Sequence, residues 1–254
     1  MKNLIFLMYV LFTFTSCSTF INTGFDIMGI YKEEVNTDKF EKNNREVVLI
    51  PMKHIAPKEF YAHVGQMVDS LKQKGYYFFW EGVAPDNRTD SLKLDTLARK
   101  IRKIWGRELA NNSEYGGSID TLKQTIRVGE KTYPLKRKVM MQPAYNKMNI
   151  DFETSRNVDI SLEEYVNIFE AKFGKIVLTS CDYQTSLFEE YHCAPIDWKY
   201  RKKVNKEITL TARNENVVNE ILKDSHSKIA VIYGAAHVPG IIELLEKEGY
   251  KKVD

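Results

Sequence analysis

The stretch KIAVIYGAAHVPGIIELLEKEGY, residues 228–250, predicts a buried strand, a turn and a helix in direct succession. Its apolar start is typical of a parallel strand that is buried on both faces, Gly234 breaks this strand, and Gly249 ends the helix. His237 stands in the turn between strand and helix. In an open α/β sheet such turns lie at the carboxyl edge, where ligand sites form.

A second stretch near the N-terminus repeats this order of signals. VVLIPMKHIAPKEF, residues 47–60, contains an apolar strand, a histidine (His54) and a proline before a helix, and a Leu-x-x-x-Gly-Tyr unit follows in both stretches. This internal similarity indicates a duplicated strand-loop-helix-strand unit. Two equivalent loops at one edge of a parallel sheet would bring His54 and His237 together.

The rest of the chain also alternates between strands and helices. Further strands are predicted at 46–51, 76–81 and 175–180, and helices at 57–74, 90–105, 161–173 and 208–224. This order predicts an α/β fold of three layers, in which a mainly parallel or mixed central sheet has helices on both faces. The periodicity weakens over 111–141, which we interpret as a mid-chain insertion with a β-hairpin at 125–135.

Composition excludes several classes of protein. A chain of 254 residues that is 43% hydrophobic can bury the core of one or two domains. The 37 basic and 34 acidic residues give a net charge of only +3, and no dense Lys/Arg block alternates with aromatic residues. We therefore expect no nucleic-acid partner.

The N-terminus predicts export. Lys2, an apolar run over 4–14 and Thr15-Ser16-Cys17 form the charged, hydrophobic and small-residue regions of a signal over residues 1–17, and the run is too short to span a bilayer. Cys17 stands at a lipobox-like position and predicts lipid attachment there, so the protein would be a membrane-anchored lipoprotein on the periplasmic or cell-surface side. An ordinary cleaved signal or a short anchor remains the alternative.

The residues after Cys17 divide into two predicted parts. Residues 18–42 are polar enough to serve as a tether without a fold of their own, and residues 43–254 would form the α/β domain. Cys181 and Cys193 would be able to pair after export, although their spacing alone does not fix the geometry of a disulfide. They show no spacing typical of metal ligands.

Glu81 completes a candidate metal site. It ends the strand YYFFWE, residues 76–81, at the same predicted edge as the two histidines, and a carboxylate beside so much apolar surface needs a cation, a donor or a proton. His54, Glu81 and His237 would leave a position open for water on zinc or a similar divalent ion. Each of them also has a simpler interpretation, as a core histidine or a salt-bridged glutamate.

The residues VIYGAAHVPGIIELLEKEGY resemble the C-terminal signature of the TraB, GumN and Tiki group. That signature has Gly-x-x-His on a strand, a glycine three residues later and a helix that ends in Gly-Tyr. The histidine and glutamate of the group's N-terminal half fall on His54 and Glu81, and its Arg-Asn pair falls on Arg213 and Asn214. Pro51 departs from the pattern, because the N-terminal motif usually has glycine there.

The resemblance implies metal-dependent hydrolysis of a peptide or related acyl bond, with zinc, manganese or cobalt as the cofactor. Glu81 and Arg213 would be catalytic, and Arg213 would hold a substrate carboxylate or stabilise an oxyanion. The alternative is a non-catalytic lipoprotein that binds or sequesters haem or a peptide, or a scaffold with a degenerate site. Asp182, just past the predicted strand at 175–180, would be a second carboxylate at this edge or a helix N-cap, and Asp151 would support the site or form a turn. His63, His192 and His226 have structural interpretations as helix or loop side chains.

Overall fold

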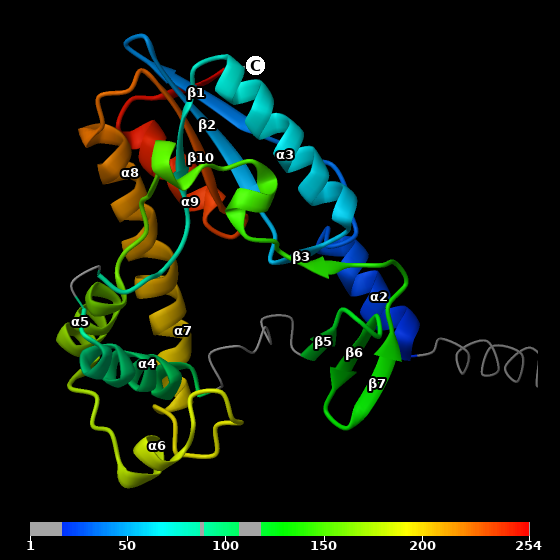
Figure 1. The fold of residues 1–254 in the computed structure, drawn as a ribbon, viewed down its shortest axis with the longest axis vertical. Helices are drawn as coiled ribbons and strands as arrows, with labels where there is room; N and C mark the ends of the chain where they lie inside the picture. Colours follow the sequence, from blue (N-terminus) through cyan, green and yellow to red (C-terminus); the bar gives the residue numbers. More distant parts are fainter. Residues whose placement is uncertain (1–16, 87–88, 107–117, 254) are drawn as a thin grey trace, which may run out of the picture. The chain divides into compact units, whose positions relative to one another are not determined.

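The computed structural model describes residues 17–86, 89–106 and 118–253. The chain divides into two compact units, and Figure 1 shows their elements. The first unit comprises Met1–Val35, Lys53–Val68 and Asn112–Asn149, and the second comprises Asn36–Met52, Asp69–Asn111 and Ile150–Asp254. Each unit is described separately below.

The second unit contains a largely parallel sheet, which confirms the predicted α/β fold class. Among the described residues its six strands follow the order β11-β1-β2-β10-β4-β9. Their bounds are Lys251–Val253, Asp38–Lys42, Arg45–Met52, Lys228–Gly234, Tyr77–Trp80 and Ser155–Asn157. The four strands β2, β10, β4 and β9 are parallel, whereas β1 is antiparallel to both β2 and β11.

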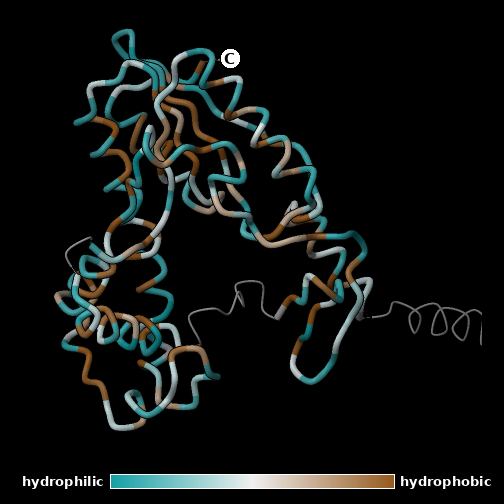
Figure 2. The backbone as a smooth tube through the Cα atoms, viewed as in Figure 1, coloured by the Kyte–Doolittle hydropathy of each residue, from teal (hydrophilic) through white to brown (hydrophobic). Residues whose placement is uncertain are grey.

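The central strands are buried on both faces. Alternate residues of β10, among them Ile229 and Val231, belong to the core formed with helices α8 (Arg213–Lys223) and α9 (Val238–Lys247). The intervening Ala230 and Ile232 are equally buried on the other face. This explains why β10 is a continuous apolar run, visible as a brown segment in Figure 2, and not an alternating one.

Both predicted strand-loop-helix-strand repeats are formed, but they close on different neighbours. In the first, α3 (Lys58–Gln73) leads from β2 to β4, which lies beside β10; in the second, α9 leads from β10 to β11, which lies beside β1. The two connections therefore run in opposite directions along the sheet.

A helical lobe extends the second unit. It contains α4 (Ser91–Trp105), α5 (Leu162–Phe173), α7 (Arg201–Val204) and a π-helical segment (Asn205–Ala212) that continues into α8. The predicted caps are present, since Asp90 begins α4, Gly106 ends it, and Ser161 forms a capping box with Glu164 at the start of α5. A short helix, α6 (Ser180–Gln184), carries Cys181, where the disulfide loop begins.

The prediction of a buried strand at 175–180 is wrong. This segment is irregular up to Thr179, and Val177 is 72% exposed. Ile176 and Leu178 pack instead against the helical lobe. An apolar run needs a neighbouring strand to become a strand itself, and here helices supply the apolar partners.

The first unit is built around a small sheet, and it also includes the N-terminal part of α3. Strands β5 (Ser118–Asp120), β6 (Thr125–Val128) and β7 (Lys131–Pro134) form an antiparallel sheet, so the predicted hairpin is confirmed. Strands β3 (Ile55–Ala56) and β8 (Met140–Met141) form a second pair. The core of the unit gathers these buried residues: Phe25, Ile30, Tyr31, Ile55, Ile126 and Val139.

The prediction that residues 18–42 lack a fold of their own is also wrong. Helix α2 (Cys17–Ile27) lies in this range, and so does β1. Phe25 and Tyr31 are buried in the core of the first unit, because a segment with several apolar side chains can pack when an adjacent sheet offers a surface.

The predicted export signal lies outside the described residues, except for Cys17, and so do residues 111–117 of the predicted insertion. Within the described part of the chain, no helix has both the length and the apolar character needed to cross a bilayer.

Candidate functional site

The carboxyl ends of β2, β10 and β4 lie side by side in the second unit. Ile232 of β10 is in register with Ile50 of β2 on one side and with Trp80 of β4 on the other. Glu81 directly follows Trp80, and Gly234 is the last residue of β10. The sheet therefore brings Glu81 beside the turn that carries His237, as the sequence predicts.

The Glu81 carboxylate is held by two parts of the protein. Its Oε2 accepts a hydrogen bond of 2.5 Å from the Gly234 backbone N–H, and its Oε1 accepts one from Arg213 Nη2. His237 Nε2 lies 3.7 Å from the same Oε1. The Glu81 side chain is only 11% exposed, so its negative charge is balanced by these neighbours more than by solvent.

Gly234 allows this close approach. A Cβ atom built at this position would lie 3.0 Å from Glu81 Oε2, closer than such contacts are normally found. The glycine of the Gly-x-x-His motif therefore serves the backbone hydrogen bond to Glu81.

Arg213 is buried and forms a bidentate ion pair with Asp159. Its Nε donates to Oδ1 over 2.8 Å and its Nη2 donates to Oδ2 over 2.6 Å. Burial by itself would lower the pKa of Arg213, but the hydrogen bonds and the charge of Asp159 outweigh it and raise the pKa. The guanidinium therefore stays charged, and it bridges Asp159 and Glu81.

Asp159 is a site residue that the sequence analysis missed. Its fully buried side chain accepts hydrogen bonds from the Gly82 and Ile160 backbone N–H groups, over 3.1 and 2.9 Å. It follows β9, a strand of three polar residues (Ser155–Asn157) whose burial depends on pairing with β4. Asp159 follows two residues after Asn157, which pairs with Trp80 of β4. A strand as short as β9 has no periodic pattern by which the sequence could predict it.

His237 is oriented by Asn214. Its Nδ1 lies 2.7 Å from Asn214 Oδ1, and an amide oxygen can only accept, so Nδ1 carries the hydrogen and Nε2 faces Glu81. Asn214 in turn packs closely against the α9 backbone: a Cβ at Gly240 would lie 2.2 Å from Asn214 Nδ2. The glycine three residues after His237 therefore makes room for the amide that positions the imidazole.

The predicted site residues thus fall into two groups. Glu81, Arg213 and His237 come together in the second unit, whereas His54 belongs to the first unit. His54 is exposed, and its backbone carbonyl accepts a hydrogen bond of 2.8 Å from the Gln142 N–H. The three-residue ligand set therefore stays a prediction.

The remaining polar candidates have structural roles. His63 Nδ1 lies 2.9 Å from the Glu33 carbonyl, and His226 stacks on Tyr77 with a ring separation of 4.1 Å. Asp151 accepts a hydrogen bond of 3.0 Å from the Glu153 N–H as an N-cap, which confirms the turn interpretation. His192 is exposed.

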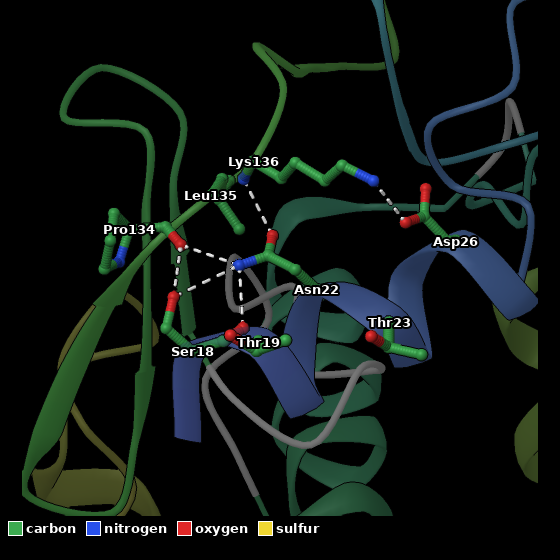
Figure 3. A pocket seen from close by; sticks show the side chains of 8 residues that line it. All are labelled: Ser18, Thr19, Asn22, Thr23, Asp26, Pro134, Leu135 and Lys136. Carbon is green, nitrogen blue, oxygen red and sulfur yellow. Dashed lines mark hydrogen bonds and ion pairs between the residues drawn. The ribbon is translucent and has the colours of Figure 1, made fainter. Parts of the chain in front are cut away.

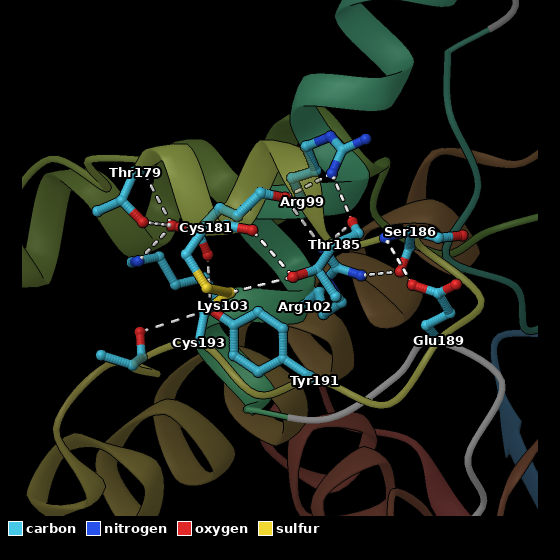
Figure 4. The surroundings of a disulfide bond; sticks show 12 residues. Arg99, Arg102, Lys103, Thr179, Cys181, Thr185, Ser186, Glu189, Tyr191 and Cys193 are labelled. Atoms are coloured by element: carbon cyan, nitrogen blue, oxygen red, sulfur yellow. Dashed lines mark hydrogen bonds and ion pairs between the residues drawn. A yellow bond between two sulfur atoms is a disulfide. The ribbon is translucent and has the colours of Figure 1, made fainter.

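Asp182 stabilises a loop that a disulfide closes. Cys181 and Cys193 are bonded, with their Cα atoms 5.9 Å apart, so the predicted ability to pair is confirmed (Figure 4). The buried Asp182 carboxylate accepts hydrogen bonds from Lys103 over 2.7 Å and from Tyr191 over 2.6 Å. Burial would raise the pKa of Asp182, but these hydrogen bonds and those from Thr179 lower it. Asp182 is thus a cap and an ion-pair partner.

The donor set of the second unit suits part of a metal site. His237 Nε2 and Glu81 Oε1 are 3.7 Å apart, a span that two donors can bridge when each lies about 2.0–2.2 Å from one zinc ion. Among the described residues, however, no group of three or more His, Cys, Asp or Glu side chains is gathered as a metal site. Glu81 and His237 are two described residues of this unit that are close enough to share a divalent ion.

Comparisons with known proteins add no relative. No family model matches the chain, and neither a curated protein nor a solved structure matches it significantly. The resemblance to the TraB, GumN and Tiki group consequently rests on the motif residues alone.

Proposed function

We propose that this chain is an exported, lipid-anchored, metal-dependent hydrolase that acts on a peptide or related acyl bond. The buried cluster of Glu81, Arg213 and His237 at the carboxyl edge of the sheet is the observation that carries the proposal. Its residue types and its place in the fold are those of a hydrolytic site that positions a water molecule and balances negative charge.

Each residue has a distinct role in this proposal. Glu81 and His237 would hold the ion, and the sequence adds His54 as a third ligand. A bound divalent ion would lower the pKa of a water molecule and polarise the scissile carbonyl. Arg213 presents a permanently charged guanidinium beside the ligands, suited to a developing oxyanion or a substrate carboxylate.

Two further residues position these groups. Asn214 sets the tautomer of His237 so that Nε2 is the nitrogen directed at Glu81. Asp159 holds Arg213 by two hydrogen bonds and leaves its remaining donors for Glu81 or for a substrate.

A non-catalytic binding protein is the second candidate. One observation favours it: both oxygens of Glu81 already accept hydrogen bonds from the protein, as in a structural ion pair. In this case the cluster would stabilise the sheet edge, and the bound molecule would be haem or a peptide.

Metal content and hydrolysis, measured together, distinguish the two candidates. The full chain is purified from the membrane fraction, its zinc, manganese and cobalt are quantified by mass spectrometry, and its activity is assayed on a peptide library. We expect about one ion per chain, and we expect Glu81→Gln, His237→Ala and His54→Ala each to lower metal content and activity together. His63→Ala, on an exposed helix surface, is the control.

Two other outcomes would favour the binding protein over the hydrolase. Folded variants that keep their metal content and activity would contradict the metal-hydrolase function. A strong visible absorption band after addition of haem would support the binding protein instead. Lipid attachment is tested separately, since Cys17→Ala is expected to abolish incorporation of labelled fatty acid.

A further inference from the structure

Helix α2 has one face fixed against the β-hairpin of the first unit. Asn22 Nδ2 donates to the Pro134 carbonyl over 3.0 Å, and the Lys136 backbone N–H donates to Asn22 Oδ1 over 2.7 Å (Figure 3). On the same side Phe25 is buried in the core of the unit, and Asp26 pairs with the Lys136 ammonium over 2.8 Å. These contacts determine which face of α2 points away.

The opposite face of α2 is apolar and exposed. Phe20 and Ile27 are 83% and 82% exposed, and seven residues, close to two helical turns, separate them, so they lie on one side of the helix. Met28, directly after the helix, is also exposed. Contiguous exposed apolar patches, as opposed to single exposed residues, are typical of sites that contact a protein or a membrane.

The position of α2 in the chain indicates what the partner is. The helix begins at Cys17, the predicted lipid attachment residue, and follows immediately after the apolar run at residues 4–14. If the chain is held by a lipid on Cys17, as the sequence predicts, or by an uncleaved apolar segment, the start of α2 would lie at the membrane surface.

The charge of the same unit fits an anionic bilayer. Residues 118–149 contain seven basic and two acidic residues, which leave a net charge of +5, although the whole chain has only +3. The basic residues are Lys123, Arg127, Lys131, Lys136, Arg137, Lys138 and Lys147. Lys123, Lys136 and Arg137 pair with Asp120, Asp26 and Glu33, and the positive charge of the other four would attract anionic lipid headgroups.

We propose that α2 lies flat on the membrane, with Phe20 and Ile27 inserted between lipid headgroups and the basic residues of 118–149 providing attraction to anionic lipids. The helix would then hold the first unit against the bilayer, in addition to any lipid on Cys17. This proposal rests on the membrane anchoring in the proposed function, but not on the proposed hydrolase activity.

Site-specific fluorescence tests the proposal in the full-length protein. The variant Ile27→Cys is labelled with the environment-sensitive fluorophore NBD, because Cys181 and Cys193 are already paired. The protein is reconstituted into phosphatidylglycerol-containing vesicles with spin-labelled lipids. Leu92→Cys, at an exposed apolar position on α4, is the matched control, and the wild-type protein sets the labelling background.

We expect a shift of the NBD emission at position 27 to shorter wavelength and a loss of intensity to the spin-labelled lipids, with neither change at position 92. Equal behaviour of the two positions would overturn the proposal. A blue shift at position 27 without quenching by lipid would also overturn it, because it would show that a protein surface covers the helix.

Discussion

The two histidine-bearing turns follow similar sequences but differ in what surrounds them. His237 is buried, with its Nδ1 on Asn214 and its Nε2 facing Glu81, whereas His54 is exposed and belongs to the other unit. The difference begins in the strands. Gly234 is in register with Met52, and not with Pro51, so His54 follows its strand one residue sooner than His237 does.

This comparison shows that similar turn motifs give a buried or an exposed histidine, depending on the neighbouring residues. Two glycines around His237 leave room for Glu81 and Asn214, but the corresponding positions around His54 are Pro51 and Pro57. Gly234 and Gly240 of the second repeat are therefore explained by the space that the side chains of Glu81 and Asn214 occupy.

The largest expected effect comes from breaking the ion-pair cluster. Arg213→Ala would leave the buried Asp159 carboxylate and Glu81 without their cation, and we expect the free energy of unfolding to fall by about 3–5 kcal/mol. His54→Ala, at an exposed position, should change it by less than about 0.5 kcal/mol. Urea denaturation measures both. Equal stabilities of the two variants would remove the distinction between the turns.

Removing the disulfide tests whether the loop at Cys181–Cys193 and the Glu81–Arg213–Asp159 cluster stabilise the second unit independently. The double variant Cys181→Ser/Cys193→Ser frees a loop of 12 residues' separation, and we expect a loss of about 3 kcal/mol. Different residues hold the loop and the cluster, so the loss should add to that of Arg213→Ala in denaturation experiments. Strong non-additivity would show that they form one cooperative site.

Gly240→Ala tests whether the missing Cβ at this position is needed to orient Asn214 and His237. The new methyl group would displace Asn214, so we expect a loss of about 1–3 kcal/mol and reduced metal binding. Gly24→Ala in α2 is the control, because nothing lies within 4 Å of a Cβ there; it should be neutral or stabilising by up to about 1 kcal/mol. Thermal unfolding of both variants checks the order, and a neutral Gly240→Ala would contradict it.

The smallest effect concerns acid stability of the helical lobe. Hydrogen bonds from Lys100 and Lys175 lower the pKa of Glu170 from 4.5 to about 2. A lowered carboxyl pKa stabilises the fold above pH 4.5, and this contribution is lost as the pH falls from 4.5 through about 2. We expect it to be about 1 kcal/mol after solvent screening, and Glu170→Gln should remove it. A variant with the same acid-unfolding curve as the wild type would contradict this assignment.

Local signals in the sequence were sufficient for much of the fold. Strands β2 and β10 are long apolar runs, and caps such as Asp90 and Ser161 mark the starts of helices, so these elements follow from short-range patterns. The run at 175–180 has the same composition but packs on helices, because its place in the fold decides its partner.

The site was predictable only in part for the same reason. Strand ends and a family motif point to Glu81, Arg213 and His237, and the sheet together with helix α8 brings these three side chains together. Asp159 was not, because it follows a short polar strand that exists only through its pairing with β4. Long-range pairing of this kind leaves no periodic signal in the sequence.

Anomalous diffraction from crystals soaked in zinc or manganese tests the central claim most directly. The account predicts a peak about 2.0–2.2 Å from His237 Nε2 and from a Glu81 carboxylate oxygen, with Arg213 released from Glu81 but still paired with Asp159. A map with no peak at this position, in which Arg213 still bridges Glu81 and Asp159, would contradict it.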